Sequence, residues 1–204
     1  MDQVFGESIK FFEFRDEVLS SFAEYGVEYK LFGGAVVQLV NPSRFTEDLD
    51  IAIKATVDSA EKFIDSLASI GYADRNNISM QVYGDVEEAG YDMTSTRRIE
   101  SSNPEWERFH IDLCFDLGEH NYETMLAEDF EVNGLKIMAV TFRHIIRMKA
   151  NMNKGYGGPR PKDIEDIQFL ANYLGLDPST GESIVEKQEK KRVPSLDLFG
   201  GDKK

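Results

Sequence analysis

Two short segments of this 204-residue chain alternate strictly between apolar and polar side chains. In the first segment, residues 48–53, the side chains of Asp48 and Asp50 share one face, because successive residues of an extended chain point to opposite sides. In the second segment, residues 109–115, the same alternation places Asp112 on a polar face with an apolar face behind it. Both segments therefore predict strands that have a hydrophobic back and a polar front.

Helical and extended patterns alternate along the rest of the chain. Helices show apolar residues at spacings of three and four, whereas strands alternate or lead into a tight turn. The helices that we predict are residues 5–25, 35–40, 58–70 (with a capping box at Asp58-x-x-Glu61), 141–152 and 163–174. The further strands are residues 27–31, 78–83, 94–100 and the two arms of a hairpin that turns at Asn133-Gly134.

These elements predict an α/β (α+β) fold in which helices flank a small mixed sheet. We expect three parts along the chain: an α/β core at residues 1–140, a C-terminal helical subdomain at residues 141–180, and a flexible tail at residues 181–204. The tail is assigned because apolar periodicity stops there while acidic and basic residues mix.

Charge and cysteine content narrow the class of protein. The 23 Lys and Arg residues face 37 Asp and Glu residues, and this net charge of −14 disfavours a broad surface for non-specific DNA binding. Residues 132–162, in contrast, form a basic segment that contains seven Lys and Arg residues and no Asp or Glu. The single cysteine, Cys114, excludes an internal disulfide, and no signal segment or bilayer-length apolar run is present. We therefore expect a cytoplasmic protein without membrane contact.

Asp48 and Asp50 are the first candidates for chemistry. On one strand face their Cα atoms lie about 7 Å apart, so their oxygens can converge on one ion. At about 5 Å and an effective dielectric of about 20, two such charges repel by roughly 3 kcal/mol. A divalent cation offsets this repulsion, and Mg²⁺ favours carboxylate and phosphate oxygens. Asp112 is the obvious third ligand, although Asp116 has the same facing, and the alternative for all of them is plain solvation.

Gly33 and Gly34 stand where a strand runs into a short helix, ten residues before Arg44. Backbone N–H groups at such a turn can hold phosphate oxygens, because glycine permits close approach and the helix end is partly positive. The turn is thus a candidate phosphate site next to the candidate metal site.

The order Phe32-Gly-Gly-Ala-Val-Val, then Arg44-x-Thr46-x-Asp-Leu-Asp-Ile-Ala-Ile, resembles the signature of the DNA-polymerase-β-type nucleotidyltransferase superfamily. The resemblance implies that the glycine turn grips the triphosphate of an NTP such as ATP. It also implies that the strand acids bind two Mg²⁺ ions, with Mn²⁺ as a substitute, and that an acid on a neighbouring strand completes the site. The residues so assigned are Gly33, Gly34, Asp48, Asp50 and Asp112. In the lead-in, Arg44 and Thr46 either contact the ligand or form a loop salt bridge and a hydroxyl turn.

Lys149 continues the apolar stripe of the helix at residues 141–152, three residues after Ile146 and four after Ile145. An inward lysine is rare unless it is paired. It therefore meets a carboxylate, reaches a cleft where phosphate binds, or extends its ammonium to solvent; we favour the cleft.

The sequence Arg-Met-Lys-Ala, followed by Arg-Pro-Lys-Asp-Ile-Glu-Asp-Ile, resembles the abortive-infection toxin nucleotidyltransferases of bacterial type IV toxin–antitoxin systems. The resemblance implies that Lys149, Lys162 and Asp163 face the active site and that an antitoxin is a partner. The alternative for Asp163 is an ordinary first-turn acid that favours the helix dipole.

We expect a transferase that moves an NMP from an NTP to RNA or protein with release of pyrophosphate. The alternatives are a small-molecule transferase of the antibiotic-modifying kind and a non-catalytic binding module. The three histidines lack the spacing of a zinc site. In the tail, Ser195–Phe199 resembles the peptide that docks on the bacterial sliding clamp, although Ser195 stands where that motif prefers Gln; the peptide can otherwise fold back on its own domain.

Overall fold

A six-stranded mixed sheet organises the N-terminal part of the chain in this computed structural model, which describes residues 2–83, 96–117, 120–151 and 158–176. The strand order is β3-β4-β2-β1-β8-β7. Strands β2 and β4 pair in parallel, as do β1 and β8, whereas the other neighbours are antiparallel. The bounds are β1 Tyr29–Phe32, β2 Asp48–Ile53, β3 Thr96–Ile99, β4 His110–Cys114, β7 Ala127–Val132 and β8 Leu135–Val140. Two short strands, β5 Asp116–Leu117 and β6 His120–Asn121, pair separately.

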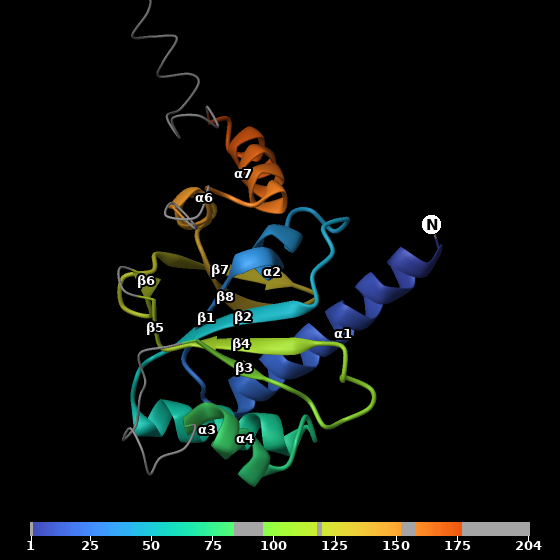
Figure 1. The fold of residues 1–204 in the computed structure, drawn as a ribbon, viewed down its shortest axis with the longest axis vertical. Coiled ribbons are helices and arrows are strands. Elements are labelled where there is room, and N and C mark those ends of the chain that lie inside the picture. Colours follow the sequence, from blue (N-terminus) through green and yellow to red (C-terminus); the bar gives the residue numbers. More distant parts are fainter. Residues whose placement is uncertain (1, 84–95, 118–119, 152–157, 177–204) are drawn as a thin grey trace, which may run out of the picture. The chain divides into compact units, whose positions relative to one another are not determined.

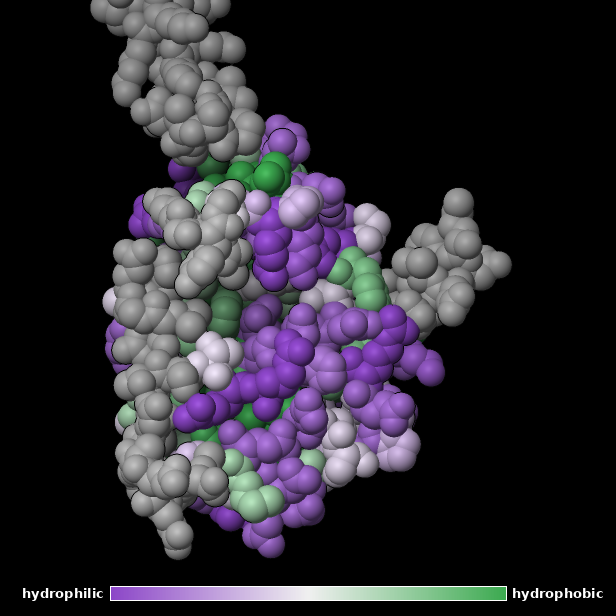
Figure 2. All heavy atoms as spheres, in the orientation of Figure 1, coloured by the Kyte–Doolittle hydropathy of each residue, from purple (hydrophilic) through white to green (hydrophobic). Residues whose placement is uncertain are grey.

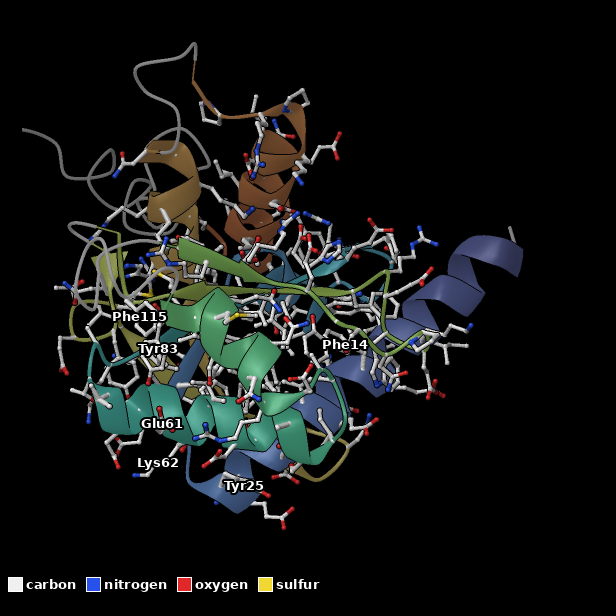
Figure 3. The ribbon with its side chains drawn as sticks, turned by 60° about the horizontal axis from the view of Figure 1, so that its bottom comes forward. Phe14, Tyr25, Glu61, Lys62, Tyr83 and Phe115 are labelled. Carbon is white, nitrogen blue, oxygen red and sulfur yellow. The ribbon has the colours of Figure 1, made fainter. Side chains whose placement is uncertain are left out.

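Helices flank this sheet, so the predicted fold class is confirmed. The helix α1 (Asp2–Tyr25) packs against α3 (Val57–Ser69), which packs against α4 (Arg75–Tyr83). Figure 1 shows α3 and α4 together below the strands, whereas the short α2 (Gly33–Gln38) lies above β1 and β2 and packs on both. The hydroxyl of Tyr83 on α4 donates a hydrogen bond of 2.9 Å to Glu61 on α3, and both residues are labelled in Figure 3.

The chain divides into two compact units, residues 1–145 and residues 146–204. The boundary lies inside α6 (Phe142–Asn151), and the second unit contains α7 (Pro161–Tyr173). The three-part division expected from the sequence stays a prediction, and the predicted tail lies outside the described residues. No helix in the described part of the chain is long and apolar enough to span a membrane.

Aromatic side chains of α1 pack against part of the apolar face of the sheet. Phe14 stacks on Phe109 with ring centroids 5.3 Å apart, and it also contacts Tyr72 and Trp106. Phe109 shares the facing of the fully buried Ile111 and Leu113 of β4. Burial of these apolar side chains fixes which face of β2 and β4 is left for polar residues.

Two local predictions are wrong. Residues 78–83 form part of helix α4 rather than a strand: Ile78 and Val82, four residues apart, are buried, whereas Met80 between them is 67% exposed. That spacing fits one face of a helix, and a short apolar pattern of this kind does not distinguish a helix from a strand. The capping box at Asp58 is also wrong, because Thr56 caps α3 by accepting a hydrogen bond from the backbone N–H of Ser59 at 3.2 Å.

Other local predictions are confirmed. The hairpin between β7 and β8 turns at Asn133 and Gly134, with φ of 54° and 79°, as a two-residue turn of this hand requires. The expected strands at residues 48–53 and 109–115 are β2 and β4, and the expected helices at both ends of the described chain are α1, α6 and α7.

Tyr72→Phe tests how the segment after α3 is attached to the sheet. The buried Tyr72 hydroxyl is hydrogen-bonded to the carbonyl oxygens of Ile99 at 2.8 Å and Phe109 at 3.1 Å. Its removal should lower the free energy of unfolding by about 1 kcal/mol. Urea denaturation followed by circular dichroism measures this loss. Tyr25→Phe, at the exposed end of α1, is the control and should change stability by less than about 0.5 kcal/mol. Equal effects of the two variants would contradict the assignment.

Candidate active site

Three carboxylates lie on one face of the sheet because of the register between β2 and β4. Asp50 of β2 is directly paired with Asp112 of β4, and Asp48 is paired with His110. Directly paired residues of neighbouring strands share a face, so the alternation of both strands brings Asp48, Asp50 and Asp112 to the polar side. Figure 2 shows mostly hydrophilic side chains over β3 and β4 on the viewed face.

The glycine turn abuts this acidic face. Phe32, the last residue of β1, is paired with Asp50, and Gly33 follows with φ of +67°. A Cβ atom on Gly33 would overlap the Asp50 carboxylate, with the Asp50 Cγ only 2.5 Å away. The turn therefore requires glycine both for its backbone conformation and for its close approach to the acid.

The segment before β2, residues 44–47, makes contacts with residues that are close in the chain. Gly34 lies so close to Thr46 that a Cβ atom would meet the Thr46 Oγ1 at 3.2 Å and an Arg44 nitrogen at 3.3 Å. The Thr46 hydroxyl is 3.3 Å from both the backbone nitrogen and the backbone oxygen of Asp48, while Arg44 donates to the carbonyl of Phe45. The structure thus brings Gly33, Gly34, Arg44 and Thr46 together beside the strand acids.

Arg98 of β3 is a site residue that the sequence analysis missed. It is paired in register with Asp112, and its Nε and Nη2 donate to the two oxygens of the Asp112 carboxylate at 2.9 Å each. Nη2 also lies 3.1 Å from Oδ1 of Asp48. The hydrogen bonds to Asp112 raise the pKa of the Arg98 guanidinium, so it stays charged. The sequence carried one signal for such a residue: three carboxylates on one face need a positive charge near them.

Oxygen donors on this face suit a hard divalent cation, because Mg²⁺ prefers carboxylates. Asp48, Asp50 and Asp112 are the residues that would hold it. Within the described ranges, however, no three His, Cys, Asp or Glu side chains are gathered closely enough to hold a metal as they stand. The guanidinium of Arg98, rather than carboxylate convergence, connects Asp48 to Asp112.

Asp116 and His110 also lie near this part of the sheet. Asp116 begins β5, which belongs to the separate two-stranded sheet, whereas Asp112 is in register with Asp50. The backbone thus places Asp112, and not Asp116, on the strand beside β2. His110 is half-buried, and its Nδ1 has no hydrogen-bond partner among the described residues.

The second unit contains a separate buried ion-pair network. The Lys149 ammonium lies 2.9 Å from Asp163 and 2.9 Å from Asp166, and the Lys149 side chain is only 6% exposed. Arg160 donates to Asp163 at 2.6 Å. Lys149 therefore points inward, as its place on the stripe predicts, and it meets carboxylates. Lys162 is exposed.

The environment of Asp163 shifts its pKa. Burial of the carboxyl group acts to raise the pKa, but hydrogen bonds from Arg160 and Lys149 outweigh burial and lower it to about 2. Asp163 is thus a charged, fully buried partner of two cations rather than only an acid that favours the helix dipole.

Comparison with known proteins identifies a family and solved structures of similar fold. The family model for the nucleotidyl transferase AbiEii toxin of type IV toxin–antitoxin systems matches residues 20–198. The structure of the antibiotic-resistance factor ANT(2'')-Ia is similar in fold, with a TM-score of 0.52 and 12% identity over 94% of this chain and 95% of that chain. An antigenic nucleotidyltransferase-like protein from Paracoccidioides brasiliensis aligns with a TM-score of 0.49 and 16% identity, over 94% and 89% of the chains. No curated protein matches the sequence.

Gly33→Ala and Gly26→Ala form a matched pair that tests the glycine turn. Both glycines have positive φ, but a Cβ atom on Gly26 meets nothing within 4 Å, whereas one on Gly33 collides with Asp50. Gly26→Ala should cost about 1 kcal/mol in unfolding free energy, the price of the left-handed conformation. Gly33→Ala should cost more and should displace the Asp50 carboxylate. Denaturant unfolding measures both variants, and equal losses would contradict the close approach.

Asp163→Asn tests the buried network and its pH dependence. Removing this charge from its cationic partners should lower stability at pH 7 by roughly 3 kcal/mol. The folded pKa of about 2 lies below the ordinary value of 3.8, so the stabilisation is complete above pH 4 and is lost as pH falls toward 2. Urea unfolding across this range should show the difference between wild type and variant shrinking. Glu165→Gln, an exposed acid on the same helix, is the control.

Proposed function

Because the chain belongs to the AbiEii family of nucleotidyl transferase toxins of type IV toxin–antitoxin systems, we propose that it transfers an NMP from an NTP to an acceptor with the aid of divalent metal ions. The observation that carries the proposal is the meeting of the Gly33 turn, the β2 acids and Asp112 on one sheet face. A phosphate-binding turn beside carboxylates is the arrangement that phosphoryl transfer needs.

In this reaction an acceptor oxygen attacks the α-phosphorus of the NTP in line. The bond from that phosphorus to the bridging oxygen of the β-phosphate breaks, and pyrophosphate leaves. Magnesium ions, two in our proposal and replaceable by Mn²⁺, supply charge neutralisation and lower the pKa of the acceptor hydroxyl. Asp48, Asp50 and Asp112 are the residues that would hold the cations through their carboxylate oxygens.

The remaining chain positions the triphosphate. The backbone N–H groups at Gly33 and Gly34 would donate to phosphate oxygens, and Thr46 and Arg44 leave no room for a side chain at Gly34. Lys162 has an exposed ammonium and remains our candidate for a further phosphate contact. Lys149 is paired with two acids, so a phosphate contact, which stays a prediction, would use its third N–H group or replace one carboxylate.

We propose the acceptor from the family rather than from the geometry. Membership of a toxin family supports RNA or protein as the acceptor and an antitoxin as the binding partner. We propose ATP in the cytoplasm as the donor. The basic segment 132–162 supplies local positive charge for an RNA contact. A small-molecule acceptor is the alternative.

A non-catalytic binding module is the rival from another class. Its partner would be the sliding clamp, bound through Ser195–Phe199, a segment outside the described residues. Metal binding without any NMP transfer would favour this rival.

Incubation with each labelled NTP, Mg²⁺ and a cell extract tests the proposal. We expect label to enter RNA or protein, and the fraction that is labelled identifies the acceptor class. Asp50→Asn should reduce incorporation by at least about 100-fold, since a ligand to the cation loses its charge. Asp58→Asn is the control, because Asp58 is an exposed acid on α3 that pairs with Lys62 of the same helix. Undiminished incorporation by Asp50→Asn would overturn the scheme.

A further inference from the structure

Two carboxylates of the candidate site already contact a positive charge, the guanidinium of Arg98. Arg98 contacts both oxygens of Asp112 at 2.9 Å and one oxygen of Asp48 at 3.1 Å. The two-point contact with Asp112 is the geometry in which guanidinium binds carboxylate most strongly. The Asp112 side chain is 19% exposed and the Arg98 side chain is 49% exposed, so solvent screens this ion pair only in part.

A divalent metal ion would use the same oxygens. Asp112 directs both of its oxygens at the guanidinium, and Asp48 directs Oδ1 at it. A metal ion ligated by these oxygens would lie within a few ångströms of the guanidinium, where like charges repel. Occupancy by the metal ion and the present position of Arg98 are therefore in competition.

We propose that Arg98 is the internal counter-cation of Asp48 and Asp112 and must release them before a divalent metal ion binds there. This inference rests on the proposed function, because it concerns the same metal site. It assigns Arg98 a role that opposes metal binding, in contrast to a residue that merely orients Asp112 as a ligand.

The position of Arg98 allows such a release. Its side chain is 49% exposed, and β3 is an edge strand of the six-stranded sheet, with β4 as its neighbour. The guanidinium can therefore turn toward water without displacing a buried side chain. Its single positive charge lies against two of the three carboxylates that the β2–β4 register brings to one face.

Arg98→Gln therefore has two expected effects. The affinity for Mn²⁺ should rise by at least about tenfold, because the competing charge is gone. In EDTA the variant should melt below wild type, since Asp48 and Asp112 lose their partner, and added Mn²⁺ should raise its melting temperature by more than that of wild type.

Mn²⁺ titration followed by electron paramagnetic resonance, together with thermal melts, measures both effects without relying on activity. Arg75→Gln is the matched control: Arg75 is also 49% exposed and pairs with two acids, Glu61 and Asp65, but on α3 and α4. It should leave Mn²⁺ affinity unchanged. Arg98→Lys should lie between wild type and Arg98→Gln, because it keeps the charge and loses the two-point contact.

A double-mutant cycle locates the competition. In an Asp112→Asn background, Arg98→Gln should raise Mn²⁺ affinity by much less than in the wild-type background. Unchanged or weaker Mn²⁺ binding by Arg98→Gln would overturn the inference, and so would the absence of binding in every variant.

The two proposals fail in distinguishable ways. If Asp50→Asn weakens Mn²⁺ binding while Arg98→Gln does not strengthen it, the proposed metal site stands and only the inference about Arg98 falls. If labelled NMP is never incorporated although Arg98→Gln binds Mn²⁺ more tightly, the inference stands and the proposed reaction falls.

Discussion

The parallel pairing of β2 with β4 is the constraint on which the candidate site depends. It sets Asp50 opposite Asp112, and a shift of one residue would turn one of the two carboxylates into the apolar core. The register is held from behind, where Ile111 and Leu113 of β4 are buried and Phe109 stacks on Phe14 of α1. Hydrophobic packing on one face thus determines where charge gathers on the other.

This gathering of charge accounts for two neighbouring features. Gly33 has positive φ and no room for a side chain, because the Asp50 carboxylate occupies the space next to it. Arg98 lies across Asp48 and Asp112, because β3 places it in register beside them. The first feature leaves the backbone of the turn next to an acid, and the second places one positive charge against two carboxylates. Both are local responses to acids that the sheet brings together.

In the second unit, too, acids lie beside cations, but there the ion pairs are buried. Lys149 and Arg160 pair with Asp163, whose pKa lies near 2, and Lys149 also pairs with Asp166. Burial of a charge without a partner is costly, so cations and acids occur together there. The inward direction of Lys149 was predictable from its helical spacing, but its carboxylate partners were not, because they come from another helix.

The amino-acid sequence by itself determined the faces of β2 and β4, the hairpin turn at Asn133-Gly134 and the glycine turn, since each depends on residues that are close in the chain. The strand predicted over residues 78–83 is wrong, because apolar residues four apart, Ile78 and Val82, suit a helix as well as a strand. Only the tertiary structure decided that Arg98 meets Asp48, 50 residues away, and that Asp112 rather than Asp116 stands beside Asp50. Strand order and register decide such contacts, and both arise from packing between segments distant in sequence.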